Sequence, residues 1–152
     1  MYDFIDRPVA SLDNGGRFLL WTVRNWVRAL SNGYCTAAAV GPAFAKWRMM
    51  GAFPPFHRML TLLNVHGLDT LAVAPVECRY VSEHEAVFLS LFSRLEDPRP
   101  TVLRDTLALL VEEEHLPSLL ASVTALGTAM MQAGIFPRAP QSVQGEVWRP
   151  ET

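Results

Sequence analysis

The chain has 152 residues, of which 50% are hydrophobic and 18% are charged, and its formal net charge is −2. A chain of this length fits one domain that buries about 70% of its unfolded surface, so folding requires neither a disulfide nor a metal. A net charge near zero gives no overall attraction for nucleic acid, and we expect no nucleic-acid partner.

The charge is unevenly distributed along the chain. Residues 1–60 hold seven basic and three acidic residues, a net charge of +4, whereas residues 61–152 hold six basic and twelve acidic residues, a net charge of −6. This pattern is compatible with head-to-tail association of two copies, or with an acidic partner that docks on the first half. Two solvated faces of one domain give the same pattern.

An irregular lead-in over residues 1–12 precedes the first predicted helix, which Asp13 or Asn14 can cap. Gly33 follows the helix and is typical of the left-handed position that ends one. Apolar residues recur between these limits at helical spacing and should face the core: Leu19, Val23, Trp26, Val27 and Leu30.

A second set on the same helix has spacings of three and four and should share one face: Arg17, Trp21, Arg24 and Arg28. An aromatic ring between guanidinium groups can bind phosphate, acidic side chains or single-stranded nucleic acid. An exposed helix face on which arginine stems partly cover Trp21 is the simpler interpretation. We keep these four residues as a candidate interaction surface.

The next two predicted helices are separated by glycine and proline. The first covers Tyr34 to about Met50, with a kink or break at Pro42, because proline lacks an amide hydrogen and clashes with the preceding turn. Pro54 or Pro55 suits the first turn of the next helix, FHRMLTLLNVH, which ends before Gly67.

Residues 68–80 have no helical period, and Pro75 argues against a central strand, so we expect an extended, partly buried connector. Ser82 and Glu85 then form a capping box, in which the serine oxygen accepts from the Glu85 amide and the Glu85 side chain accepts from the Ser82 amide. This pattern predicts the start of a fourth helix, EHEAVFLSLFSRL.

A fifth helix is predicted from about Thr101 to Glu114, and Pro117 suits the first turn of a sixth helix that Gly134 ends. The segment 137–152 holds three prolines and no helical period, which indicates a tail. Trp148 in this tail is a candidate interaction residue.

Together these elements predict an all-α fold: one domain over residues 1–136, a bundle of five to six helices with an extended connector near 68–80, followed by the irregular Pro-rich tail 137–152.

Several segments also resemble a small α-helical family of alphaproteobacteria to which no activity is attached. The matching segments lie within about residues 15–95: RFLLWTVRNWVRAL, a small-residue second helix, a leucine-rich third helix, AVAPVEC and SEHEAVFLSLF. The resemblance implies the fold and no function. That family has more than one cysteine near Cys78, whereas this chain has one, which argues against metal or redox chemistry.

The stretch 116–137 contains no charged residue and is long enough to span a bilayer. Its serine, threonine and glutamine residues and Pro117 favour a central buried helix instead, with a subunit interface or membrane contact as alternatives. Small side chains spaced by four residues form a ridge that lets helices approach closely: Ala121, Ala125 and Ala129.

Catalytic and metal-binding signatures are largely missing from the sequence, which has no CxxC pair, HExxH, Walker loop, GxGxxG or GxSxG motif. Cys78 and His84 are the local pair that could support thiol or metal chemistry. Glu112-x-x-His115 has the spacing of half a ferritin-like site, without a second copy. We therefore expect no catalytic residue, no metal and no cofactor.

The N-terminal segment MYDFIDRPVASLD is acidic and lacks an apolar stretch, so we expect no signal peptide, a cytoplasmic location and reduced thiols. The sequence best fits a non-catalytic protein-interaction or accessory subunit that binds a protein partner or a second copy of itself. A thiol- or metal-dependent protein using Cys78 and His84, and a membrane-peripheral subunit using residues 116–137, remain as alternatives.

Overall fold

A computed structural model describes residues 4–69, 72–95 and 100–138 of the chain. These residues form α-helices and short 3₁₀ turns, and none of them lies in a β-sheet, so the predicted all-α single-domain fold is confirmed. The α-helices are α1 (Asn14–Ser31), α2 (Thr36–Lys46), α3 (Phe53–His66), α4 (Glu83–Ser93), α5 (Pro100–Ala108) and α6 (Leu116–Gln132). The 3₁₀ turns are η1 (Val9–Ser11), η2 (Met50–Ala52) and η3 (Glu113–His115).

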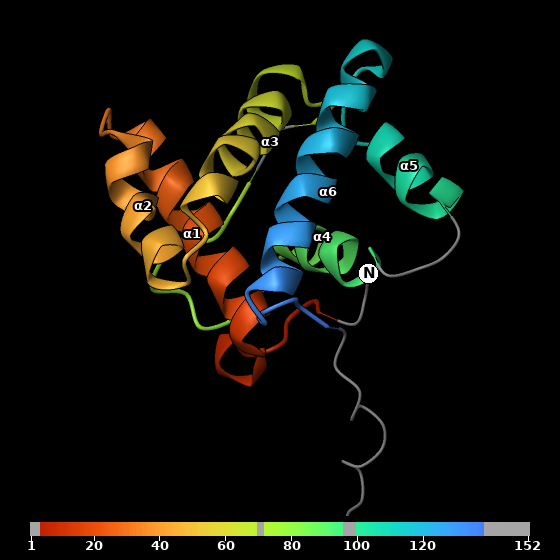
Figure 1. Ribbon diagram of the computed structural model, residues 1–152. Helices are drawn as coiled ribbons and strands as arrows, with labels where there is room; N and C mark the ends of the chain where they lie inside the picture. The colour runs from red at the N-terminus through yellow and green to blue at the C-terminus, as the bar shows by residue number, and fades with distance from the viewer. Residues whose placement is uncertain (1–3, 70–71, 96–99, 139–152) are drawn as a thin grey trace, which may run out of the picture.

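Two helix pairs make the most extensive contacts between elements, α3 with α6 and α1 with α2. Figure 1 shows α6 in the middle of the bundle, between α3 and α5, with α4 behind it. Each of the six α-helices contributes large, fully buried side chains to one shared core, including Trp26, Phe44, Phe56, Phe92, Leu107 and Leu126. The apolar faces of the helices therefore meet in a single core, as expected for the predicted one-domain bundle.

Several predicted helix ends are confirmed in atomic detail. The Asp13 side chain caps α1 by accepting a hydrogen bond from the Gly16 amide at 2.8 Å. Gly33 follows α1 with φ of 75°, and Gly134 follows α6 with φ of 79°, both in the left-handed region that favours glycine. Prolines occupy the first turns of α3 and α6, as predicted.

Two predicted boundaries are wrong. The second helix starts at Thr36 and continues through Pro42 without a break, ending at Lys46. The fifth helix ends at Ala108 instead of Glu114, because Val111 is buried in extended backbone that forms an isolated bridge with Gly67.

The connector after α3 is irregular where it is described, as predicted, and the N-terminal lead-in pairs with its far end. The Val9 amide donates to the Arg79 carbonyl at 2.8 Å, and the Val81 amide donates to the Arg7 carbonyl at 2.9 Å. These bonds hold the segment before α4 against the segment before α1.

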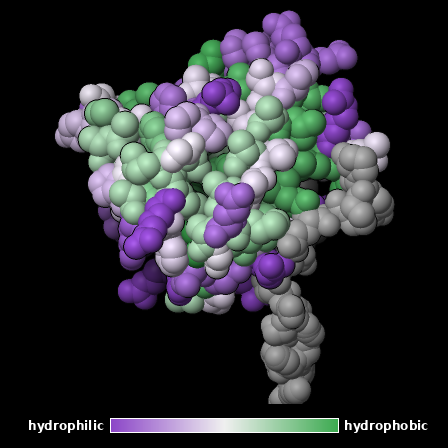
Figure 2. All heavy atoms as spheres, in the orientation of Figure 1, coloured by the Kyte–Doolittle hydropathy of each residue, from purple (hydrophilic) through white to green (hydrophobic). Residues whose placement is uncertain are grey.

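The sixth helix buries one stripe and exposes another. Leu119, Val123, Leu126 and Met130 are fully buried, which fits the predicted central helix. No helix within the described ranges is both long enough and apolar enough to cross a membrane. On the face shown in Figure 2, hydrophobic residues extend over much of the middle of the bundle, and hydrophilic residues gather at its upper end and along its lower edge.

Candidate functional site

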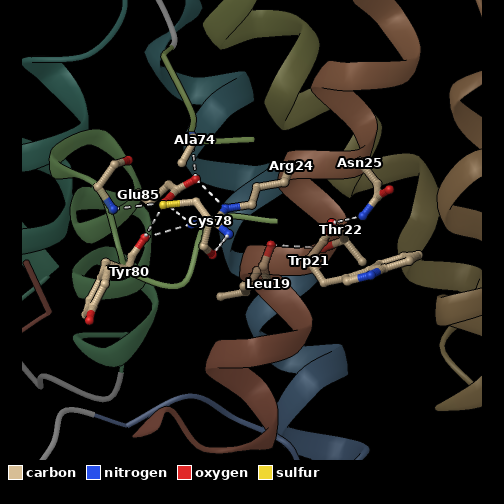
Figure 3. Close-up of polar contacts among 10 residues, drawn as sticks. Leu19, Trp21, Thr22, Arg24, Asn25, Ala74, Cys78, Tyr80 and Glu85 are labelled. Atoms are coloured by element: carbon tan, nitrogen blue, oxygen red, sulfur yellow. Dashed lines mark hydrogen bonds and ion pairs between the residues drawn. The ribbon is translucent and has the colours of Figure 1, made fainter. Parts of the chain in front are cut away.

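Arg24 of α1 points into the molecule, although its spacing had suggested an exposed face. Its side chain is 3% exposed and forms a two-pronged ion pair with Glu85 of α4, with both nitrogen–oxygen distances at 2.8 Å. Two further donors of its guanidinium reach the carbonyls of Cys78 at 2.8 Å and Tyr80 at 2.9 Å. Figure 3 shows how this one arginine links α1, the connector and α4.

Glu85 is equally well satisfied from its other side. Its carboxylate accepts hydrogen bonds from the amides of Ser82 and Ala74, each at 2.9 Å. Burial raises the pKa of Glu85, but the hydrogen bonds from Arg24, Ser82 and Ala74 outweigh burial and leave this pKa below its ordinary value. The ion pair raises the pKa of Arg24 against the opposing effect of its burial.

The capping box at the start of α4 is present, but its two halves differ. The Ser82 amide donates to Glu85 Oε1 at 2.9 Å, which is the predicted return bond. The Ser82 hydroxyl faces the Glu85 amide without hydrogen-bond geometry and has no partner within the described residues. Glu85 therefore anchors both the connector and the helix start.

A groove of about 630 Å³ lies beside this network, between α1, α2 and the connector. Arg24 forms part of its floor, and Pro42, Ala43 and Val76 line its walls. The other lining residues are Val9, Asn14, Arg17, Phe18, Leu20, Trp21, Lys46, Trp47 and Cys78. The structure thus brings three of the four predicted α1 residues, Arg17, Trp21 and Arg24, to one concave surface.

The groove combines cations with aromatic rings. Trp21 is 44% exposed, and Trp47 is half-buried with Lys46 Nζ 5.9 Å from its ring centroid. Exposed Arg17 donates to Asn14 Oδ1 at 2.8 Å, which orients its guanidinium along α1. No acidic residue is among the described lining residues. Apart from Arg24, which Glu85 neutralises, Arg17 and Lys46 make this surface electropositive.

The remaining predicted interaction residues lie elsewhere. Arg28 is exposed on α1 but does not line the groove. On α6, Ala121 and Ala125 are exposed and Ala129 is half-buried, so the small-residue ridge lies outside the buried stripe. Trp148 lies outside the described residues.

Two residues that were not predicted from the sequence complete the groove from the end of α2: Lys46 and Trp47. Both residues are near the predicted helix end, and nothing in their local spacing marks them as neighbours of Arg17 and Trp21. The packing of α2 against α1 creates this proximity. Such a surface is therefore created by tertiary packing and cannot be recognised from local sequence spacing.

Cys78 and His84 do not form a ligand set. Cys78 Sγ lies 3.4 Å from the Tyr80 carbonyl as a hydrogen-bond donor, and His84 Nδ1 accepts from the Ala72 amide at 3.1 Å.

Within the described ranges, the group of three side chains that could hold a metal is instead His66, Glu112 and His115. Glu112 and His115 were noticed from their spacing, but His66 comes from α3.

Comparisons with known proteins give the chain no relatives. No protein-family model matches it. No curated protein and no solved structure matches it either. The resemblance to an alphaproteobacterial helical family stays a prediction, and function must be inferred from the sites themselves.

Proposed function

We propose that this protein is a non-catalytic interaction module that binds an acidic segment of a partner protein in the groove between α1 and α2. The observation that carries this proposal is the set of lining side chains: two exposed cations and two tryptophans, without an acidic residue in the described lining. Segments with carboxylate and aromatic or aliphatic side chains complement such a surface in both charge and hydrophobicity.

The cations and the tryptophans of the groove have separate roles in binding. Arg17 and Lys46 are exposed, so they attract acidic side chains during encounter and pair with them at the rim. Trp21 and Trp47 offer large apolar area between these cations, and tryptophan is the residue most often found to dominate binding energy at protein interfaces. The cations therefore select charge, and the rings supply most of the affinity.

The floor of the groove is fixed before any partner arrives. The Arg24–Glu85 pair holds the carbonyls of Cys78 and Tyr80, which sets the position of the connector wall. A rigid surface loses less conformational entropy on binding than one that must order itself. The buried pair therefore supports recognition by holding the floor and the connector wall of the groove in place.

A peptide-display experiment tests the chemistry directly. Random peptides are selected on the immobilised full-length chain, and selected peptides are titrated in solution while tryptophan fluorescence is recorded. We expect enrichment of sequences that combine acidic with aromatic or aliphatic residues, and an emission change on binding. Trp21→Ala should weaken binding by about 2 kcal/mol, or roughly 30-fold, as for a hot-spot residue.

Charge-reversal variants provide the matched control. Arg17→Glu and Lys46→Glu should each weaken binding at least about tenfold, whereas Arg28→Glu, an exposed arginine on the same helix but outside the groove, should leave it unchanged. Equal loss in all three variants would reduce the effect to net charge and overturn the proposal, as would a selected set with no acidic enrichment.

Self-association is the competing occupant, because the second half of the chain carries a net charge of −6. Sedimentation of the full-length protein separates the two cases. A monomer that binds the selected peptides supports a partner protein. A dimer that Arg17→Glu dissociates and Arg28→Glu does not would place a second copy in the groove and overturn the proposal.

A further inference from the structure

Three side chains of types that can bind a metal lie together where α3 ends and α6 begins. None of them lines the α1–α2 groove. His66 is the last residue of α3, Glu112 precedes η3, and His115 is the last residue of η3. One ligand atom from each lies within 4.8 Å of the others. The group brings together the two helices with the most extensive contact in the fold, α3 and α6, since His115 directly precedes α6.

Glu112 lies at nearly the right distance from both histidines to share an ion with them. Glu112 Oε1 lies 3.6 Å from His66 Nδ1 and 3.9 Å from His115 Nε2. Ligands bonded to tetrahedral zinc at about 2.0–2.1 Å are separated by roughly 3.3 Å. The two pairs that include Glu112 are therefore a few tenths of an ångström longer than this separation. All three ligand atoms lie within 4.8 Å of one another, so the two histidine rings must also reorient before one ion can bind all three.

His115 provides an independent indication of a ligand. Its Nε2 is buried and has no hydrogen-bond partner among the described residues, although the carboxylate of Glu114 lies 3.3 Å away and that of Glu112 lies 3.9 Å away. A buried polar atom without a partner is uncommon in a folded protein, and a bound ion is one of its recognised explanations. Two carboxylates around this nitrogen also attract a cation.

The backbone around the group is held in place without the side chains. The Leu68 amide donates to the Leu110 carbonyl at 2.9 Å, the Glu112 amide donates to the His66 carbonyl at 3.3 Å, and Gly67 forms a bridge with Val111. His66 also stands at the C-terminal end of α3, where the helix dipole favours positive charge. Two segments distant in sequence are thus preorganised to share one ion.

From this geometry we infer that His66, Glu112 and His115 form a zinc-binding site. Two imidazoles and one carboxylate are a typical zinc ligand set, and three protein ligands leave a fourth position for water. The inference departs from the expectation of no metal, which rested on local sequence spacing. It does not depend on the proposed groove, because no residue of the group lines it.

Binding changes the geometry of the two histidine rings in a measurable way. Their centroids are 3.6 Å apart and their planes differ by 19°, so the rings are stacked. A metal bound to both nitrogens lies in the plane of each ring, and nearly parallel planes cannot share it. Zinc therefore rotates the rings apart, which shifts their proton resonances and leaves other histidines, such as His57, unaffected.

The experiment uses the tag-free, full-length protein with zinc alone as the probe. Calorimetric titration should give one equivalent bound, and the midpoint of thermal unfolding should rise with zinc because the ion binds the folded chain preferentially. Cobalt in place of zinc should give the visible absorption of tetrahedral nitrogen and oxygen coordination. The histidine resonances should move with the same stoichiometry.

A charge-matched pair of variants decides the assignment. Glu112→Gln and His115→Gln should each lower zinc affinity at least about tenfold, whereas Glu113→Gln, exposed and outside the group, should not change it. Circular dichroism without metal confirms that each variant is folded. Full binding in the His115 variant would place the zinc on other groups, such as Cys35 or Cys78, and overturn the inference, as would no binding to the native chain.

Discussion

Two clusters of described residues bring carboxylates to nitrogen-bearing side chains, and the clusters differ in how completely their hydrogen bonds are satisfied. At the Arg24–Glu85 pair both side chains are at most 3% exposed, and each guanidinium nitrogen and carboxylate oxygen has a partner. At the group of His66, Glu112 and His115 the side chains are 37%, 56% and 23% exposed, and His115 Nε2 has no hydrogen-bond partner among the described residues.

The difference separates a structural role from a binding capacity. A buried polar network with all bonds made fixes one conformation and leaves no donor or acceptor for a ligand. A partly exposed group with an unpaired nitrogen loses little when a ligand arrives and gains new bonds. The first cluster therefore shapes the groove wall, and the second can take up an ion.

Breaking the buried cluster should produce the largest effect. Arg24→Met removes one partner and leaves Glu85 as an uncompensated buried charge, which typically costs about 3–5 kcal/mol. The carbonyls of Cys78 and Tyr80 also lose their donors. Urea unfolding of the variant beside the native chain measures the loss.

A second variant sharpens this prediction. Arg24→Lys keeps the positive charge but cannot make the two-pronged bond or reach two carbonyls together, so it should restore only part of the stability. If Arg24→Met unfolds at the native urea concentration, the pair contributes nothing and the contrast between the clusters fails.

Acid should weaken the buried cluster through Glu85. The pKa of Glu85 is lower in the folded chain than its unfolded value of about 4.3. The stability it contributes is therefore fully present above that unfolded value and is lost as the pH falls through about 4.3 toward the folded pKa. Unfolding free energies measured from about pH 6 to pH 3 should fall steeply for the native chain.

Glu85→Gln tests the source of this pH dependence. The variant should be less stable near neutral pH and should lose less stability on acidification, since its amide does not titrate in this range. Glu113→Gln changes the same charge on an exposed side chain and should keep the native slope. An unchanged slope in Glu85→Gln would assign acid sensitivity to other carboxyls.

The two clusters also show what the sequence can and cannot predict. The Ser82–Glu85 pattern predicted the start of α4 because a capping box depends on residues three positions apart. The partner of Glu85 is 61 residues away in the chain, and Arg24 was placed on an exposed face from its spacing with Arg17 and Trp21. Helical spacing identifies a shared face, but it does not identify which long side chain turns inward.

Long-range pairing also explains why the fifth helix ends earlier than predicted. The run from Thr101 to Glu114 has helical composition, but the bridge between Gly67 and Val111 ends α5 at Ala108. This same bridge brings His66 beside Glu112, so the wrong helix boundary and the overlooked ligand group have one cause. The apolar stripes, helix caps and prolines are local, and they predicted the bundle.

The smallest expected effect lies at the exposed cluster without metal. Glu112→Gln removes a carboxylate that is 56% exposed and contacts His66 and His115 at 3.6 and 3.9 Å, beyond ordinary hydrogen-bond range. We expect its metal-free unfolding free energy to stay within about 0.5 kcal/mol of the native value, as for surface substitutions in general. In the presence of zinc the same variant should fall behind the native chain, because it loses the stabilisation by the bound ion. A loss above about 1 kcal/mol without metal would show that Glu112 already holds α3 to the start of α6, as Glu85 holds the connector to α1, and the two clusters would then share one structural role.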